Sequence, residues 1–317
     1  MLTRRDTLKL AVAAAATSAL PASVLAAFDP AELITRAIPK TGERLPIVGL
    51  GSSATFRSVA QSDDISALTE VMKTLVDNGG TVFDTAPSYG ASEAVSGRIA
   101  HDAGLTDTMF WATKVNALGR GEPGPAEPEK VSAQLEQSFE RARKEPIDLI
   151  QVHNLADLPN QMAAIQALKE EGRIRYIGTT ATNPRRDADL EQAMKDYPID
   201  FIGVDYAVDN RRAAERILPL AQDLGIATLI YVPFGRSRLF ARTRGMAVPD
   251  WAQEFGAMSW GQFFIKYVAA HPATTCVTPA TSKAKNMLDN IGAAYGELPD
   301  AAALRKMEEL VDSLPGA

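Results

Sequence analysis

The chain has 317 residues, of which 46% are hydrophobic and 23% charged, as is ordinary for a globular protein. Its net charge is −6, and the body of the chain carries no basic stripe or block of like charges, which argues against a nucleic-acid partner. A single cysteine, Cys276, and three widely spaced histidines rule out an intrachain disulfide and give no support to a structural metal site.

The first 27 residues have the pattern of an export signal. Arg4 and Arg5 stand in a short charged segment, an alanine-rich apolar run covers residues 8–20, and small residues follow at 21–27. The apolar run is shorter than the ~20 residues that span a bilayer. The segment resembles a twin-arginine (Tat) signal, although Thr7 stands where that pattern prefers phenylalanine. The resemblance implies export of a folded protein to the periplasm by the Tat machinery, with cleavage near Ala26 or Ala27 and no stable membrane anchor afterwards.

The rest of the chain alternates short apolar runs with amphipathic stretches. Residues 65–75, 131–142, 159–172 and 259–270 have helical periodicity or helix-end residues. Several of the apolar runs are rich in β-branched or aromatic residues, which is typical of buried parallel strands. The predicted strands are residues 47–51, 81–84, 110–115, 148–152, 174–178, 201–205, 227–231 and 275–279.

Eight strands that alternate with helices fit either a (β/α)₈ barrel or a doubly wound sheet. The doubly wound sheet usually carries a G-x-G-x-x-G fingerprint after its first strand. Here Gly49 and Gly51 lack the third glycine, and no obvious helix start follows them. We therefore expect a single-domain (β/α)₈ TIM barrel over residues 28–317, preceded by the signal peptide at 1–27.

Four ionisable residues follow one another at the ends of three consecutive predicted strands. Asp84 ends the second strand and Tyr89 follows five residues later, Lys114 ends the third strand, and His153 ends the fourth. In a parallel barrel the active site is built at the carboxyl ends of the strands, so these side chains should meet there. Taken singly, each residue has an equally good structural explanation. Their order along the chain favours a shared catalytic role.

The four groups suit proton transfer to a carbonyl oxygen. The ordinary pKa of tyrosine, near ~10, is high for a proton donor at neutral pH, and a nearby ammonium group lowers it. Lys114 could supply that charge, and Asp84 could compensate it in an apolar setting. His153 could hydrogen-bond the carbonyl and orient it, so that a proton from Tyr89 reaches the oxygen while hydride reaches the carbon.

These residues stand in motifs similar to those of the aldo-keto reductase family. The matching stretches include FDTAPSYG at residues 83–90 and DLIQVHN at 148–154, with further matches at 45–51, 113–115, 172–178 and 278–283. The resemblance runs from about residue 36 to 315. It implies a (β/α)₈ barrel and reversible reduction of a small-molecule aldehyde or ketone with a nicotinamide cofactor. Tyr89 would be the general acid, tuned by Lys114 and Asp84, and His153 would orient the substrate.

The resemblance also implies a set of cofactor-binding residues, namely Thr180, Tyr231, Ser282, Lys283 and Asn290. Tyr231 matches the aromatic residue that stacks on the nicotinamide, and Thr180 takes the place of a serine that binds the carboxamide. Ser282, Lys283 and Asn290 match contacts to the adenosine phosphate and adenine. A lysine at position 283 suits a 2′-phosphate and so favours NADP over NAD.

Two positions depart from the family pattern. Ala181 stands where the family carries asparagine, and Gly203 stands where it often carries glutamine. An alanine or a glycine cannot replace the hydrogen bonds of an amide side chain. These losses, together with export, leave open an alternative function: an exported non-redox barrel, either a ligand-binding protein or an isomerase, that has lost the normal use of NADP(H).

Overall fold

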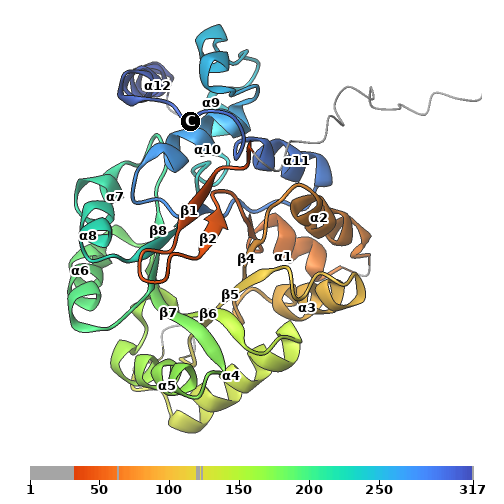
Figure 1. Cartoon of the computed structure of the whole chain (residues 1–317), viewed down its shortest axis with the longest axis vertical. Helices are drawn as coiled ribbons and strands as arrows, with labels where there is room; N and C mark the ends of the chain where they lie inside the picture. Colours follow the sequence, from red (N-terminus) through yellow and green to blue (C-terminus); the bar gives the residue numbers. More distant parts are fainter. Residues whose placement is uncertain (1–31, 63, 119–121, 123, 316–317) are drawn as a thin grey trace, which may run out of the picture.

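The computed structural model describes residues 32–62, 64–118, 122 and 124–315, so the predicted signal peptide lies outside the described residues. Eight parallel strands form one sheet in which each strand pairs with its neighbours in the sequence. Parallel bridges from Val48 to Val277 and from Gly51 to Ala280 join the first strand to the last and close the sheet into a barrel (Figure 1). The strands are β3 (Leu50–Gly51), β4 (Val82–Asp84), β5 (Phe110–Val115), β6 (Ile147–Val152), β7 (Ile174–Ala181), β8 (Phe201–Asp205), β9 (Ala227–Tyr231) and β10 (Cys276–Val277).

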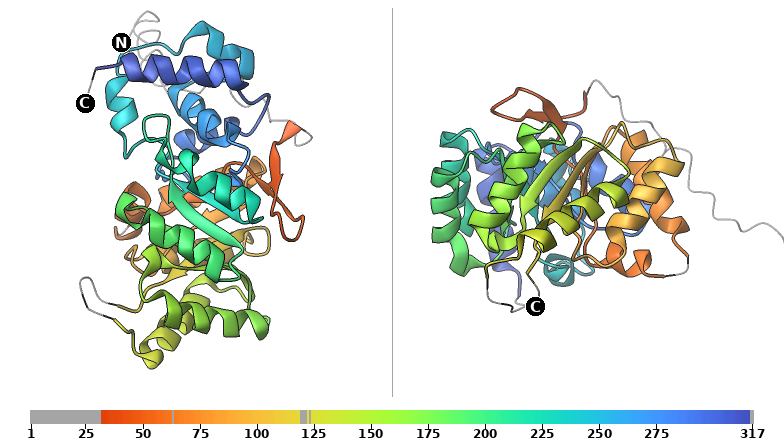
Figure 2. Two further views of the ribbon diagram at one scale, coloured as in Figure 1. Left: turned by 90° about the vertical axis from the view of Figure 1, so that its left-hand side faces the viewer. Right: turned by 90° about the horizontal axis from the view of Figure 1, so that it is seen from below.

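All eight predicted strands are present, and helices surround them in the views of Figures 1 and 2. The expected (β/α)₈ barrel is therefore confirmed. The helices are α1 (Thr55–Ala60), α2 (Ser66–Asp77), α3 (Ser92–Asp102), α4 (Pro128–Ala142), α5 (Leu158–Glu170), α6 (Asp187–Asp196), α7 (Arg212–Glu215), α8 (Ile217–Asp223), α9 (Arg238–Arg242), α10 (Trp260–Ala270), α11 (Ala284–Gly292) and α12 (Ala301–Ser313). None of the helices in the described part of the chain is long and apolar enough to cross a membrane.

Helix α4 shows how the sequence sets these elements. Pro128 stands at its first turn, where a proline costs no hydrogen bond. Val131, Leu135 and Phe139 recur every four residues and are buried on one face. The helix ends at Ala142, and the backbone of the next residue, Arg143, is left-handed with φ of 52°. The periodicity of residues 131–142 predicted this helix.

Two features that precede α2 in the chain were not predicted. The first is the short helix α1, which follows β3 where no helix start was expected. It has no side-chain hydrogen bond at its N-terminus and is held by the buried Phe56 and Ala60. The second is an antiparallel hairpin of β1 (Thr35–Ala37) and β2 (Arg44–Pro46). Strands this short leave too little alternation for detection.

The hairpin closes the amino-terminal end of the barrel, and in Figure 1 it crosses the barrel opening. Ile38 and Leu45 from the hairpin are buried in one cluster with inward-facing side chains of the barrel strands, including Phe110, Leu149 and Phe201. The Thr41 and Tyr176 hydroxyls add a hydrogen bond of 3.0 Å between hairpin and barrel. The hairpin therefore fills this end of the barrel, and the opposite end, where the strands have their carboxyl ends, stays open.

Candidate active site

A cavity of about 770 Å³ opens at the carboxyl ends of the strands. Its lining includes all four predicted catalytic residues and two of the predicted cofactor-binding residues: Asp84, Tyr89, Lys114, His153, Thr180 and Tyr231. Each of them stands in one of the last strand positions or in the loop that follows. The barrel therefore gathers side chains from positions as far apart as 84 and 231, as expected for this architecture.

Asp84 and Lys114 form a buried ion pair at the floor of the cavity. The Lys114 Nζ lies 2.8 Å from each carboxylate oxygen of Asp84 and 2.8 Å from the Thr85 carbonyl oxygen, so all three ammonium protons have acceptors. Burial on its own lowers the pKa of Lys114, but Asp84, Tyr89 and Glu93 together outweigh this effect and the net direction is upward. Burial also raises the pKa of Asp84, against the opposing charge of Lys114. The lysine is therefore held in its charged form.

Tyr89 lies beside this pair, with the Lys114 Nζ 5.3 Å from the centre of its ring. From the sequence, Lys114 was expected to lower the pKa of Tyr89. That effect is present, but burial raises the pKa of Tyr89 by more, so the net shift is upward and the expectation is corrected. Tyr89 is consequently a protonated phenol near neutral pH, which is the form that donates a proton.

His153 faces Tyr89 across the cavity, and their ring centres are 5.9 Å apart in an edge-on arrangement. Burial and the positive charge of Lys114 lower the pKa of His153 to about 3. The imidazole is therefore neutral at physiological pH and cannot be the acid. Its Nδ1 lies 3.4 Å from the Ser88 hydroxyl oxygen. If that hydroxyl donates, the Nε2 carries the ring proton and is free to bind a carbonyl oxygen.

Tyr231 occupies the floor beside the ion pair. Its hydroxyl donates to Asp84 Oδ1 over 3.2 Å and accepts from Gln151 Nε2 over 3.1 Å. The ring passes over Gly203, where a Cβ would lie 2.6 Å from the Tyr231 hydroxyl oxygen. The missing side chain at position 203 therefore makes room for this phenol. The chain lacks the glutamine that the family often carries at position 203, and the Tyr231 hydroxyl places another polar group in that space.

The second departure, Ala181, has a different explanation. Ala181 is buried in the apolar core outside the barrel sheet, and it is absent from the cavity lining. Its neighbours Thr180 and Thr182 do line the cavity. The Thr180 hydroxyl oxygen accepts a hydrogen bond of 2.8 Å from the Asn154 backbone N–H, which leaves the hydroxyl proton free for another partner. Side chains alternate between the two faces of β7, so Thr180 and Thr182 present hydroxyls to the cavity and Ala181, at the family's asparagine position, does not.

The three residues predicted to contact the adenosine part of the cofactor lie outside this cavity lining. Ser282 and Lys283 directly precede α11, and Asn290 stands within that helix. Lys283 is exposed and Asn290 is buried. They follow the lining residue Ala280 in the sequence, but the structure does not place them in the lining of the cavity. Their role remains a prediction.

The structure adds a carboxylate that the sequence analysis missed. Asp205 ends β8, lines the cavity, and has a buried Oδ1 with no hydrogen-bond partner among the described residues. Burial raises the pKa of Asp205 to about 6, and the positive charge of Arg236 opposes this shift. The rule that found Asp84, a polar residue at the end of a predicted strand, applies equally to Asp205 and could have found it.

Two arginines also line the cavity, Arg57 from α1 and Arg236 from the loop after β9. Both are exposed, and neither makes an ion pair or side-chain hydrogen bond within the described part of the chain. Arg238, two residues after Arg236, pairs with Asp209 over 2.8 Å and does not line the cavity.

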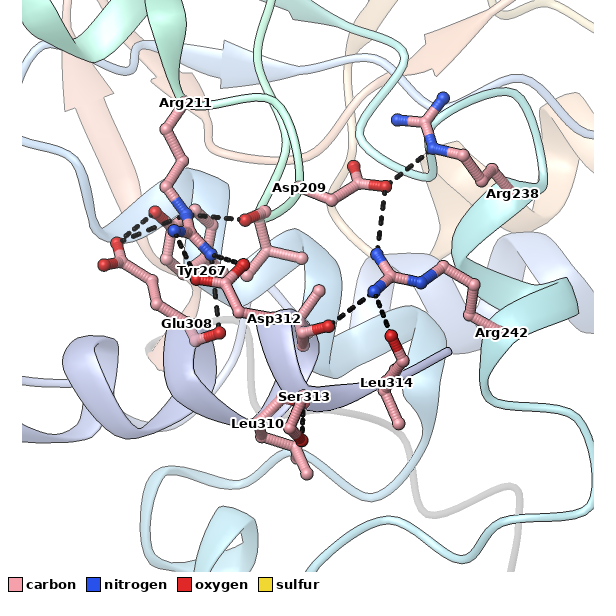
Figure 3. A network of polar contacts seen from close by, with 12 residues as sticks. Asp209, Arg211, Arg238, Arg242, Tyr267, Glu308, Leu310, Asp312, Ser313 and Leu314 are labelled. Atoms are coloured by element: carbon pink, nitrogen blue, oxygen red, sulfur yellow. Dashed lines mark hydrogen bonds and ion pairs between the residues drawn. The ribbon is translucent and has the colours of Figure 1, made fainter. Parts of the chain in front are cut away.

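The loop that carries Arg236 is anchored at its far end by a network of polar contacts (Figure 3). Asp209 pairs with both Arg238 and Arg242. Arg242 donates to the last carbonyl groups of α12, at 2.7 Å to Val311 and 2.9 Å to Leu314. These contacts fix the end of the loop against the C-terminal helix, so the loop residues at the cavity are held from both sides.

Among the large aromatic side chains, Phe234 lines the cavity, and the three tryptophans do not. Trp111 is fully buried against Phe83, with ring centres 4.9 Å apart. Trp251 and Trp260 both pack against Phe263. Trp111 therefore belongs to the core, and Trp251 and Trp260 are partly buried against it.

Across the residues that the structure describes, no group of three or more His, Cys, Asp or Glu side chains is placed to hold a metal ion. The cavity presents a phenol, a neutral imidazole and a buried ammonium–carboxylate pair. Such a set of groups is able to transfer a proton to or from an oxygen atom.

Residues 48–311 match the family model described as "Aldo/keto reductase family", which covers most of the chain, and the chain therefore belongs to this family. It is an oxidoreductase that reduces carbonyl groups or oxidises the corresponding alcohols. Aldo-keto reductase str7 from Strobilurus tenacellus is 27% identical over 305 residues, covering 85% of this chain and 88% of the relative. Aldo-keto reductase YhdN from Bacillus subtilis is 30% identical over 205 residues, covering 61% and 60%.

Solved structures share the fold. The aldo-keto reductase AKR11C1 from Bacillus halodurans has a TM-score of 0.69 at 21% identity, covering 88% of this chain and 96% of its own. An aldo-keto reductase from Klebsiella pneumoniae, solved in complex with NADPH, has a TM-score of 0.70 at 20% identity, with 88% and 95% covered. The family match over residues 48–311 favours the reductase over the non-redox alternative.

Proposed function

We propose that this oxidoreductase reduces an aldehyde or ketone with NADPH, and that Tyr89 delivers the proton. The observation that carries the proposal is the placement of Tyr89 between the buried Lys114 ammonium and the neutral His153 imidazole, on one wall of the cavity. A carbonyl oxygen that enters this space meets a phenol and an imidazole, both able to donate a hydrogen bond. Bound NADPH would supply the hydride that the carbonyl carbon receives.

The residues of the chain divide the proton chemistry among them. Tyr89 gives its proton to the carbonyl oxygen as the carbon is reduced, and the product is the alcohol. The tyrosinate that remains is stabilised by Lys114, whose charge lowers the pKa of Tyr89. Asp84 keeps Lys114 charged although both side chains are almost fully buried. His153 orients the carbonyl and does not exchange a proton, because its pKa is about 3.

The cavity fits the nicotinamide end of the cofactor. The Tyr231 ring lines its floor and offers a flat apolar surface. The Thr180 hydroxyl has a free proton for a carboxamide oxygen, and the buried Asp205 Oδ1 has no partner and could accept from a carboxamide nitrogen. The exposed cations Arg57 and Arg236 favour an anionic ligand at the rim. The NADPH complex of the Klebsiella pneumoniae relative supports the same cofactor here.

The preference for NADPH over NADH rests on the resemblance at Ser282, Lys283 and Asn290. An exposed lysine at position 283 is free to pair with a 2′-phosphate. Fluorescence titration of the mature protein with NADPH and NADH tests this assignment. We expect NADPH to bind more tightly, and Lys283→Ala to weaken NADPH while leaving NADH unchanged. Lys285→Ala, two residues along and also exposed, is the matched control.

An absence of binding by either nucleotide would contradict the proposed function. The protein would first have to be shown folded and free of co-purified cofactor. Equal affinity for the two nucleotides, unaffected by Lys283→Ala, would contradict only the assignment of the phosphate contact.

We further propose that residues 1–27 are a twin-arginine signal and that the mature enzyme works in the periplasm. The paired Arg4 and Arg5, the short apolar run and the small residues near Ala26 support the proposal. Replacement of both arginines by lysine should hold the full-length chain in the cytoplasm, as cell fractionation would show. Export of that variant at the wild-type level would contradict recognition by the Tat machinery.

A further inference from the structure

The hydroxyl of Tyr231 is part of the polar cluster at the cavity floor. It lies 3.2 Å from Asp84 Oδ1, and the centre of its ring is 5.3 Å from the Lys114 Nζ. The same Lys114 Nζ lies 5.3 Å from the centre of the Tyr89 ring. Two phenols therefore flank one ammonium group, and each has a different partner. Tyr89 faces the substrate space, whereas Tyr231 faces the carboxylate.

The hydrogen-bond direction at Tyr231 is fixed by its two partners. Gln151 Nε2 can only donate, so the Tyr231 oxygen accepts from it over 3.1 Å. The single Tyr231 proton is then directed to Asp84, which is an acceptor when ionised. Gln151, Tyr231 and Asp84 thus form a chain of donors that ends on the carboxylate. Hydrogen bonds of this kind to an ionised group are roughly twice as strong as neutral ones.

The barrel provides the space for this arrangement through a glycine on the strand next to β9. Gly203 on β8 has no side chain to fill the position beside the Tyr231 ring. A Cβ at position 203 would come within 2.6 Å of the Tyr231 hydroxyl oxygen. The Tyr231 phenol and a side chain at position 203 are therefore mutually exclusive. The absence of a side chain at position 203 lets the Tyr231 hydroxyl reach the interior of the barrel, which supports a specific role for that hydroxyl.

We propose that Tyr231 is a positioning residue whose hydroxyl holds the Asp84 carboxylate in its ionised form, and so keeps Lys114 charged beside Tyr89. The inference deepens the proposed function and rests on it for its catalytic consequence. Its local part, the effect of Tyr231 on Asp84, requires no cofactor. This second role is additional to the stacking that the family resemblance implies for the ring.

The ionisable groups that face Asp84 come from several elements. Lys114 approaches from β5, Tyr231 from β9 and Cys276 from β10, while Tyr89 follows β4 itself. Burial raises the pKa of Asp84, and hydrogen bonds from Lys114 and Tyr231 lower it. Removal of the Tyr231 hydroxyl leaves burial less opposed. The pKa of Asp84 should therefore rise.

Tyr231→Phe removes the hydroxyl and keeps the ring, and the titration of the Asp84 carboxyl carbon by NMR in the ligand-free protein measures the effect. We expect the midpoint to move upward by about one to two pH units, from the strength of a hydrogen bond to a charged group. Tyr176→Phe is the matched control, because Tyr176 is also inward-facing but donates to Glu43 at the closed end of the barrel. An unchanged Asp84 titration in Tyr231→Phe would overturn the inference.

Kinetics separate positioning from stacking. In Tyr231→Phe we expect kcat to fall about tenfold to a hundredfold, with the acid limb of its pH profile displaced upward and the NADPH dissociation constant unchanged. An unchanged kcat and an unchanged pH profile would mean that Tyr231 acts only through its ring, which the phenylalanine keeps, and the inference would fail. If wild-type protein bound no NADPH, the proposed function would fail, while the carboxyl titration would still decide the role of Tyr231.

Discussion

The Lys114 ammonium is shared evenly by the two carboxylate oxygens of Asp84, at 2.8 Å from each. Both side chains are almost fully buried, with 1% and 4% of their surface exposed. A buried ion pair is costly to form, and breaking it by removing one partner costs more, because the remaining charge stays buried. The pair is therefore both the electrostatic centre of the site and a point at which the fold is vulnerable.

Lys114→Met should destabilise the protein severely by leaving Asp84 unpaired. We expect the free energy of unfolding to fall by about 3–5 kcal/mol, measured by denaturant titration at neutral pH. The double variant Asp84→Asn/Lys114→Met removes both charges and should recover a large part of this loss. Equal stability of the single and double variants would show that the buried charge is not the cause.

His153 makes the fold sensitive to acid. Its pKa falls from 6.5 to about 3 in the folded state, so between these values the unfolded chain binds a proton that the folded chain does not. The stabilising contribution is complete above pH 6.5 and is lost as the pH falls toward 3, at up to about 1.4 kcal/mol per pH unit. Unfolding measured across this range should show a shallower slope for His153→Gln than for wild type. Parallel slopes would contradict a neutral, buried imidazole.

Asp205 has the opposite linkage. Burial raises the pKa of this carboxyl from 3.8 to about 6, so the folded state favours the protonated form. Stability is lost as the pH rises through that window. Because the group is partly exposed, we expect Asp205→Asn to stabilise the ligand-free protein by only about 1–2 kcal/mol at pH 7. The gain should vanish below pH 4, and thermal unfolding at both pH values measures it. A destabilised Asp205→Asn at pH 7 would show that the carboxylate has a partner.

Gly203→Ala tests the space that Tyr231 occupies. An added Cβ would collide with the Tyr231 ring and hydroxyl, so the ring must shift or the strand must move. Overpacking of this kind typically costs about 1–3 kcal/mol. Ala112→Gly on β5 is the control, because it changes an inward position without crowding. Gly225→Ala is less informative, because that glycine has a positive φ of 63° and an alanine there would be strained. Normal stability of Gly203→Ala would contradict the close contact.

The strands and the polar residues at their ends could be predicted from the sequence because both depend on local patterns. Asp84, Lys114 and His153 each follow an apolar run, and parallel strands bring such positions to one end of a barrel. The hairpin at residues 35–46 was missed, since its strands have three residues each and carry no clear alternation. The hairpin packs against side chains inside the barrel that come from distant strands, and no local sequence pattern shows this packing.

The role of Tyr231 shows a second limit of sequence reasoning. Considered alone, Gly203 indicates only that a polar contact made by the family's glutamine is lost. Only the packing of neighbouring strands shows that the phenol of Tyr231 occupies that space and reaches Asp84. The net pKa shift of Tyr89 was mispredicted for a related reason, because the size of the burial effect depends on the whole cavity. Contacts between distant elements decide both cases.

The central claim is that Tyr89 donates the proton in carbonyl reduction, and carbonyl-dependent oxidation of NADPH by wild type and Tyr89→Phe tests it most directly. The phenylalanine keeps the ring against His153 and removes only the hydroxyl. We predict that turnover falls by about 10²–10⁴-fold while NADPH binding is retained. Turnover by Tyr89→Phe at the wild-type rate would contradict the account.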